Sequence, residues 1–380
     1  MSHDATAATP FTGWMEDEAR AVALLEHLVS IPSVTGDTAR VAATLVAWGE
    51  AQGLHAGTTP TGAPWLSTAE DPFHNATRPH ILLFGHVDTV PGEVPVRRVT
   101  DEEEGEVLWG RGSVDAKGAA AVFATLVARW KDQDRPGTVT MIGSVDEEGD
   151  SETAHWAKDA FTAPPDAIVI GEPSGAHAVT LGYKGRLKVR VRVRRDVAHA
   201  GSPEESAADA LVGLLARFRE DLEERAEGTE GMFGVVTLTT KSLGSKSDGL
   251  TDEAIALLDI RVPPGHDDAR VLGFFRRDPA HPTIEVLDSV PGHLAGKDSG
   301  LVRAFTAAIR EEGVRPRHLR KTGTSDQCIL APAWPKAEVA TYGPGDARFD
   351  HTPHERIRLV DVKAAVRVLD RALKATVASR

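Results

Sequence analysis

Histidine and acidic residues follow several short apolar runs of the sequence, at the places where β-strands would end. In an open α/β sheet, ligand sites form in the crevice beyond the carboxyl ends of the strands. Imidazole and carboxylate groups gathered at one such edge suit zinc and neighbouring transition metals. The sequence therefore predicts a metal-dependent hydrolase. The residues concerned are His86, Asp88, Asp115, Glu147, Glu148, Glu172 and His351.

The elements that must position these residues alternate between helix and strand. Some segments repeat apolar residues at helical spacing, and the short apolar runs between them are typical of buried strands. Because this alternation favours a mostly parallel sheet with helices on both faces, we expect an α/β catalytic domain. The expected helices cover 17–29, 38–52, 116–130 and 153–160, and the expected strands cover 80–84, 138–144 and 167–170.

The pattern changes from about residue 180. The order of elements becomes strand–helix–strand–strand–helix–strand, which is typical of a ferredoxin-like α+β module. These strands are expected at 187–193, 235–240, 254–262 and 283–287, and the helices at 206–225 and 269–276. A helix at 299–312 and a strand at 337–341 then return to the first pattern. We therefore expect a discontinuous catalytic domain, 1–179 and 293–380, with a lid or dimerisation domain inserted at 180–292.

Length and composition favour a globular protein of two domains. A chain of 380 residues exceeds what one hydrophobic core normally serves. The formal net charge of −13 argues against a nucleic-acid partner. No apolar run reaches the ~18 residues of a membrane span, and the first residues lack the basic and apolar regions of an export signal. With a single cysteine, which fits a reducing compartment, the sequence predicts a cytoplasmic protein without a membrane partner.

Six motifs, in this order along nearly the whole chain, resemble the signature of the M20 metallopeptidase family. They are His86–Asp88, Gly112–Gly118, Asp146–Gly149, Gly171–Pro173, His199–Gly201 and His351–Pro353. The family includes acetylornithine deacetylase and succinyl-diaminopimelate desuccinylase. Within it, the segments Gly85–Pro95 and Leu108–Gly118 are most similar to the hydrolases that release lysine or ornithine from LysW, a small acidic amino-group carrier protein.

The resemblance implies two divalent metal ions, zinc first, with cobalt and manganese as alternatives for the same ligands. Asp115 matches the carboxylate that bridges two ions about 3.5–4 Å apart. His86 and Glu172 would complete one ion's ligands, and Glu148 and His351 the other's. By its spacing, Asp88 can accept the free ring N–H of His86. Glu147 is the candidate general base that takes a proton from the attacking water and passes it to the leaving amine.

The inserted module carries the substrate candidates that the resemblance implies. His199 matches a histidine that reaches across a homodimer to polarise the scissile carbonyl. Arg261 matches a position that binds the substrate carboxylate, a task that suits a bidentate guanidinium. Gly323, Thr324 and Ser325 resemble a loop that lines the same site. A homodimer is expected on this resemblance alone.

Each assignment has a plainer alternative. Glu147 and Glu148 could form a solvated acidic turn, Asp88 could cap a turn, and His199 could be a turn histidine. The ensemble of motifs favours the catalytic interpretation. Cys328 lies near the candidate substrate loop, but packing is a better explanation for it than a thiol mechanism. Between the two histidines near the C-terminus, the family pattern selects His351, and we expect His354 to be exposed.

A row of basic residues separates two substrate classes. Alternate positions of one strand carry Lys184, Arg186, Lys188, Arg190, Arg192 and Arg194. Because side chains alternate faces along a strand, with roughly 6.6 Å between same-face residues, these six cations would line one face over more than about 30 Å. So long a row suits docking of an acidic protein better than anchoring of an amino acid. A solvated face, or an edge protected by charge from aggregation, is the alternative.

The prediction is therefore an M20-type amidohydrolase that releases lysine or ornithine from the C-terminal glutamate side chain of the acidic carrier protein during amino-acid biosynthesis. An N-acetylornithine deacetylase, or a related small-molecule deacylase or carboxypeptidase, is the main alternative. A non-catalytic binding module with the same fold is disfavoured by the complete set of ligands and base. Lysine and ornithine differ by one methylene, worth only about 1–3 kcal/mol in a pocket, and both remain candidates.

Overall fold

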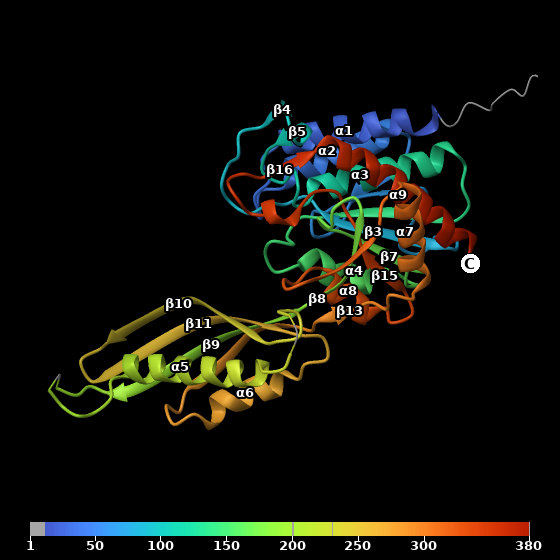
Figure 1. Cartoon of the computed structure of the whole chain (residues 1–380). Coiled ribbons are helices and arrows are strands. Elements are labelled where there is room, and N and C mark those ends of the chain that lie inside the picture. The colour runs from blue at the N-terminus through green and yellow to red at the C-terminus, as the bar shows by residue number, and fades with distance from the viewer. Residues whose placement is uncertain (1–11, 200, 230, 380) are drawn as a thin grey trace, which may run out of the picture. The chain divides into compact units, whose positions relative to one another are not determined.

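The computed structural model describes residues 12–199, 201–229 and 231–379. The N-terminal segment, where the sequence predicts no export signal, lies outside these residues. The chain divides into two compact units (Figure 1). The first comprises Met1–Leu181, Ala295–Leu319 and Ala333–Arg380, and the second comprises Gly182–Leu294 and Arg320–Pro332. Residues 320–332, which the sequence places in the catalytic domain, therefore belong to the second unit.

A nine-stranded mixed sheet forms the centre of the first unit. Its strand order is β1-β2-β6-β3-β7-β15-β8-β13, and β14 also pairs with β8. The neighbours β6 (Thr138–Ser144), β3 (His80–His86), β7 (Ala167–Gly171) and β15 (Glu338–Thr341) are parallel. Every residue of β3, β6 and β7 is buried, as expected for parallel strands covered on both faces.

Shorter strands extend this sheet or form a second, three-stranded one. The extensions are β1 (His55–Thr58), β2 (Pro64–Ser67), β8 (Ala178–Tyr183), β13 (His293–Leu294) and β14 (Arg317–Lys321). The small sheet has the order β16-β5-β4, with β16 (Arg356–Arg358), β5 (Gly105–Trp109) and β4 (Arg97–Asp101). Its central strand, β5, leads into the loop that carries Asp115.

The helices of the first unit cover the sheet, and α3 is the most enclosed of them. It is buried from Lys117 to Trp130, and α1 and α9 pack against it. The buried guanidinium of Arg129 in α3 pairs with Asp17 of α1 and Asp370 of α9, which ties the three helices together. The helices are α1 (Met15–Val29), α2 (Ala39–Ala51), α3 (Lys117–Asp132), α4 (Glu152–Ala160), α7 (Gly300–Glu311) and α9 (Leu359–Ala378), with 3₁₀ turns at Thr12–Trp14 and Ala347–Phe349.

The second unit contains the antiparallel sheet β10-β11-β9-β12 and two helices on one of its faces. Leu187 and Val189 of β9 pack against Phe218 of α5 and Phe275 of α6 in its core. Its elements are β9 (Gly185–Asp196), α5 (Ala207–Ala226), β10 (Thr237–Ser247), β11 (Thr251–Val262), α6 (Asp268–Arg277), β12 (Thr283–Val290) and the short α8 (Gln327–Ala333). The predicted α/β fold with an antiparallel α+β module is thus confirmed.

Candidate metal centre

Three neighbouring parallel strands end at the same edge of the large sheet. His86, the last residue of β3, is in register with Ser144 at the end of β6, and Gly85 is in register with Gly171 at the end of β7. Glu147 and Glu148 follow β6, and Glu172 follows β7 directly. The strand register therefore brings three candidate segments together, as the sequence predicts.

One group of possible ligands contains His86, Asp115 and Glu172, all buried. Their ligand atoms lie within 4.8 Å of one another. Nε2 of His86 is 3.2 Å from Oδ1 of Asp115 and 3.9 Å from Oε1 of Glu172. Ligands bound about 2 Å from one tetrahedral ion lie about 3.3 Å apart, so these spacings fit a shared divalent ion.

A second group contains Asp115 again, with Glu148 and His351. Nε2 of His351 is 2.9 Å from Oδ2 of Asp115 and 2.7 Å from Oε1 of Glu148. The two oxygens of Asp115 therefore face two different histidines, one in each group. This is the arrangement that a carboxylate needs in order to bridge two ions.

The carboxylates of the two ligand groups stabilise positive charge on the neighbouring histidines. Burial alone would lower the pKa of His86, but hydrogen bonds to Asp115 and Asp88 raise it well above its ordinary value. Hydrogen bonds to Asp115 and Glu148 raise the pKa of His351 to about 10. In the opposite sense, the two imidazoles lower the pKa of the Asp115 carboxyl despite its burial. A divalent cation would meet the same carboxylates, so the donor set fits the metal that the sequence predicts.

Glu147 lies next to the first group without being one of its three ligands. Its carboxylate forms a third group with His86 and Glu148, in which the ligand atoms also lie within 4.8 Å. The turn that carries Glu147 is held by Asp146, which accepts hydrogen bonds from the Thr153 amide at 3.1 Å and the Thr153 hydroxyl at 2.8 Å. The candidate base is therefore partly buried beside His86 and Glu148, not a freely solvated acid.

Asp88 lies beside His86, where the sequence predicts its contact with the ring, and it also holds the acidic turn. Nδ1 of His86 donates to the backbone oxygen of Asp88 at 3.0 Å, whereas the Asp88 carboxylate is farther away, at 3.4 Å. That carboxylate accepts the backbone N–H groups of Glu147 and Glu148, each at 3.2 Å, and the Thr35 hydroxyl. The bond from Nδ1 leaves Nε2 of His86 to coordinate a metal, and the carboxylate positions the acidic turn.

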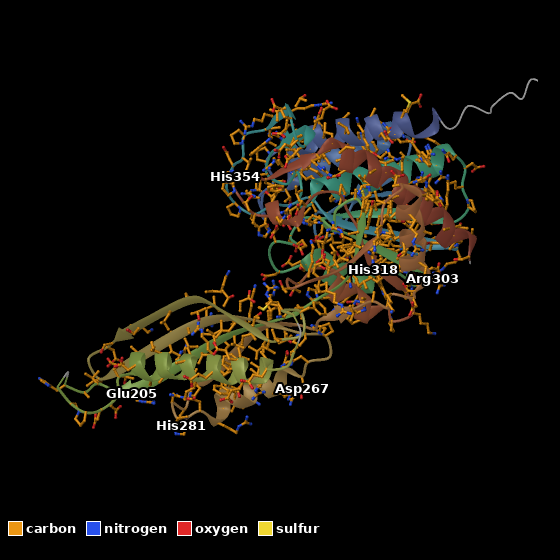
Figure 2. All side chains as sticks on the ribbon, viewed as in Figure 1. Glu205, Asp267, His281, Arg303, His318 and His354 are labelled. Atoms are coloured by element: carbon orange, nitrogen blue, oxygen red, sulfur yellow. The ribbon has the colours of Figure 1, made fainter. Side chains whose placement is uncertain are left out.

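The C-terminal ligand comes from a loop outside the sheet. His351 has a positive φ of 61°, a conformation uncommon for residues other than glycine. Its neighbour His354 is exposed, as expected, at the surface of the first unit (Figure 2). The residue after it, Glu355, is completely buried and bonds to the loop that carries Asp115. The sequence offers no pattern that singles out Glu355, because its partners lie far away along the chain.

The substrate candidates lie in the second unit. Nε of Arg261 is 2.8 Å from the Asp259 carboxylate, and its Nη1 donates to the Thr324 hydroxyl at 2.8 Å. That hydroxyl donates in turn to the backbone oxygen of Lys184. Ser325 is buried, whereas Gly323 is exposed. The structure thus brings Arg261 and Thr324 together.

His199 and Cys328 lie in contrasting surroundings. His199 is exposed, and its Nδ1 accepts the backbone N–H of Gly201 at 3.1 Å. Cys328 is buried and clusters with Tyr183 and Val290. Its burial fits the packing role expected from the sequence.

The basic row lies on β9, with one correction. The burial pattern of β9 alternates as predicted, with the apolar residues inside and the basic residues on the opposite face. Lys184 does not belong to this surface: it precedes the strand, is fully buried, and donates to the backbone oxygen of Met232 and the hydroxyl of Thr237. The arginines of the row form ion pairs, Arg186 with Asp288, Arg190 with Glu285, and both Arg192 and Arg194 with Glu253. Three carboxylates face these four arginines, so the row stays only partly positive.

Comparison with known proteins identifies the family. A family model described as "Peptidase family M20/M25/M40" matches residues 82–375. The chain belongs to this family. It is therefore a hydrolase of a metallopeptidase family whose chemistry uses divalent metal ions, and the groups described above are the candidate ligands.

Relatives of this M20 chain have related names. A LysW-lysine hydrolase from Deinococcus radiodurans is 38% identical over 366 residues, which cover 94% of this chain and 97% of the relative. A putative LysW-lysine/LysW-ornithine hydrolase from Thermococcus kodakarensis is 41% identical over 293 residues, 77% of this chain and 75% of the relative. The resemblance inferred from the motifs is thus confirmed.

Solved structures share the fold. An aminopeptidase PepT from Bacillus cereus has a TM-score of 0.73 at 17% identity, covering 94% of this chain and 98% of that one. An M20 family metallo-carboxypeptidase from Sulfolobus solfataricus has a TM-score of 0.72 at 16% identity, covering 93% and 98%. Among the helices in the described part of the chain, none is long and apolar enough to cross a membrane.

Proposed function

We propose that this M20 hydrolase releases lysine or ornithine from the C-terminal glutamate side chain of an acidic amino-group carrier protein. The observation that carries the chemistry is Asp115, whose two oxygens face His86 and His351 at 3.2 and 2.9 Å. The names and near full-length match of the relatives support the substrate. The single cysteine fits a reaction in the cytoplasm.

Two divalent ions, zinc first and cobalt as the alternative, fit the two ligand groups that share Asp115. When bound, such ions supply Lewis acidity, which makes water a stronger acid and an amide carbonyl a better electrophile. His86 and Glu172 would hold one ion, and Glu148 and His351 the other.

Glu147 moves the proton in this proposal. Its carboxylate takes a proton from the water molecule that forms the new C–O bond at the amide carbon. As the C–N bond breaks, Glu147 gives that proton to the departing amine of lysine or ornithine. The backbone bond from Glu147 N–H to Asp88, at 3.2 Å, holds the base in place for both transfers.

The second unit would recognise the amino acid and its linkage. Arg261 uses three of its five N–H groups on Asp259 and Thr324. Its two other N–H groups would bind the substrate carboxylate. Gly323 and Ser325 flank Thr324 in the same loop. His199 would polarise the scissile carbonyl across a homodimer, which its exposed position allows.

The basic row on β9, from Arg186 to Arg194, would steer the acidic carrier. Lys188 and Arg190 lie between the two ends of the row, and both are partly exposed. Complementary charge raises the rate of encounter with a protein partner and makes it sensitive to salt.

Mass spectrometry of the carrier tests the reaction. Metal-loaded enzyme is incubated with carrier whose terminal glutamate bears lysine, and with the same carrier bearing ornithine. We expect the carrier to lose one amino acid and free lysine or ornithine to accumulate. Intact carrier, together with rapid cleavage of N-acetylornithine, would show that the chain is a small-molecule deacylase.

A further inference from the structure

Glu355 forms a buried hub beneath the loop that carries Asp115. It is completely buried, and its Oε1 accepts the backbone N–H groups of Val114 at 3.1 Å and Asp115 at 3.2 Å. Its Oε2 accepts Nη1 of Arg111 at 2.6 Å. One carboxylate therefore satisfies two adjacent backbone donors and one guanidinium of the same loop.

The backbone around Glu355 reinforces this connection. The N–H of Gly110 donates to the backbone oxygen of Glu355 at 3.3 Å, and Arg356, the next residue, pairs with Trp109 where β16 joins β5. Glu355 therefore binds both the start of the loop, at Gly110, and its end, at Val114 and Asp115. His351 lies only four residues before that point, so Glu355 links the segments of two candidate ligands.

A second buried group, the ammonium of Lys117, holds the chain just after Asp115. Nζ of Lys117 donates to the backbone oxygen of Leu28, in the last turn of α1, at 3.1 Å and to that of Ile31, just beyond the helix, at 2.7 Å. Asp115 therefore lies between two buried charged groups: the Glu355 carboxylate, which accepts hydrogen bonds from the loop, and the Lys117 ammonium, which is bound to the end of α1. Neither Glu355 nor Lys117 is among the candidate metal ligands.

We propose that Glu355 is a positioning residue that holds the Asp115 carboxylate in the orientation required to bridge two ions. Losing the Glu355 carboxylate would leave buried N–H groups without an acceptor, and the loop would have to rearrange to satisfy them. Rearrangement would move the one ligand that both groups share. The inference rests on the proposed dimetal function, and it concerns metal affinity, not only turnover.

Titration of the metal-free full chain with Co²⁺, in competition with a chelator, tests the proposal. We expect Glu355→Ala to weaken metal binding by about 10–100-fold, the usual effect of removing a group that orients a ligand. The visible absorption of bound Co²⁺ should change as well, because it reports ligand geometry. Glu355→Gln keeps an acceptor oxygen and should lose less affinity, which provides a test if the alanine variant folds poorly.

Glu338 offers a matched control. Its carboxylate also accepts two adjacent backbone N–H groups, those of Gly300 at 2.6 Å and Leu301 at 2.9 Å. It lies at the start of β15, in register with Ala167 at the start of β7, whereas Glu172 follows the other end of β7. Glu338→Ala should lower the melting temperature and leave Co²⁺ affinity unchanged.

The outcomes separate this proposal from the proposed function. Unchanged affinity in both Glu355 variants, or an equal loss in Glu338→Ala, would overturn the role of Glu355. Wild-type protein that binds fewer than two ions would contradict the dimetal site instead. In that case, the effect of Glu355→Ala on a single ion held by Asp115 would still decide its positioning role.

Discussion

At the scale of single residues, the position of Asp115 decides the chemistry. Its oxygens face His86 from the end of β3 and His351 from a loop near the C-terminus. Neither histidine is near Asp115 in sequence, so only the fold brings the three together. Glu147, bonded through its backbone to Asp88, adds a carboxylate outside the two ligand groups that share Asp115.

Removing the Glu147 carboxylate should separate catalysis from metal binding. We expect Glu147→Gln to lower kcat by about 10²–10⁴-fold, the usual contribution of a general base, while the metal content stays the same. Steady-state turnover and elemental analysis of the same sample provide the measurement. Glu152→Gln, at an exposed carboxylate in the first turn of α4, is the control and should keep full activity. Unchanged turnover of metal-loaded Glu147→Gln would refute its role as the base.

The sequence predicts the residues that the structure brings together, but not all of their partners. His86, Glu148 and Glu172 could be found because each follows an apolar run that forms a strand. The main contacts of the Asp88 carboxylate could not, because they are backbone N–H groups on another strand's turn. The sequence does not predict the role of Glu355 for the same reason: hydrogen bonds to a distant backbone leave no pattern in the side chains.

At the scale of elements, the basic face of β9 is the feature that would distinguish a carrier protein from a small substrate. We expect the triple change Arg190→Gln, Arg192→Gln and Arg194→Gln to raise the KM for carrier-linked lysine several-fold, roughly in line with lost surface charge pairs, and to weaken its salt dependence. The KM for N-acetyllysine should stay the same. Glutamine is chosen over glutamate because Glu253 and Glu285 already lie beside these arginines.

Three arginines on α6 provide a control for that experiment. Arg270, Arg276 and Arg277 are exposed on a helix that packs against the opposite face of the same sheet. Replacing these three by glutamine removes the same charge from the unit. Equal effects of the two triple variants would contradict docking on β9 and indicate a response to net charge alone.

Elements with strong apolar patterns could be predicted closely, and polar ones could not. The strand at Thr138–Ser144 has the expected bounds because all of it is buried. In contrast, β10 continues to Ser247, beyond the expected end at 240, because its last residues are exposed on both faces and carry no alternation. The spacing predicts a surface position for Lys184, because spacing alone does not reveal that β9 begins one residue later, at Gly185.

At the scale of the whole molecule, partly buried ion pairs between helices make stability depend on pH. Burial raises the pKa of Glu312, but the hydrogen bonds from Arg367 and Arg371 lower it by more than burial raises it. The pKa of Glu312 is therefore below its ordinary value. A carboxyl with a lowered pKa in the folded state stabilises the protein above its ordinary pKa. This stabilisation is lost as the pH falls through the folded value.

Glu312→Gln should therefore lower the free energy of unfolding at pH 7 by about 1–2 kcal/mol, as expected for lost hydrogen bonds between charged groups. It should also flatten the decline in stability below about pH 5. Urea unfolding at several pH values measures both effects. Glu311→Gln is the control, since that neighbouring carboxylate is 62% exposed and should matter little. If the free energy of unfolding of Glu312→Gln depended on pH as it does in the wild type, Glu312 would not be the source of this stabilisation.

The most direct test of the central claim is a comparison of kcat/KM for carrier-linked lysine, N-acetylornithine and N-acetyllysine, using metal-loaded enzyme at low and moderate salt. We predict a large preference for the carrier-linked substrate that decreases as salt is added, because screening weakens the attraction between opposite charges. Efficient cleavage of the acetylated amino acids, insensitive to salt, would contradict the account and make the chain a small-molecule deacylase.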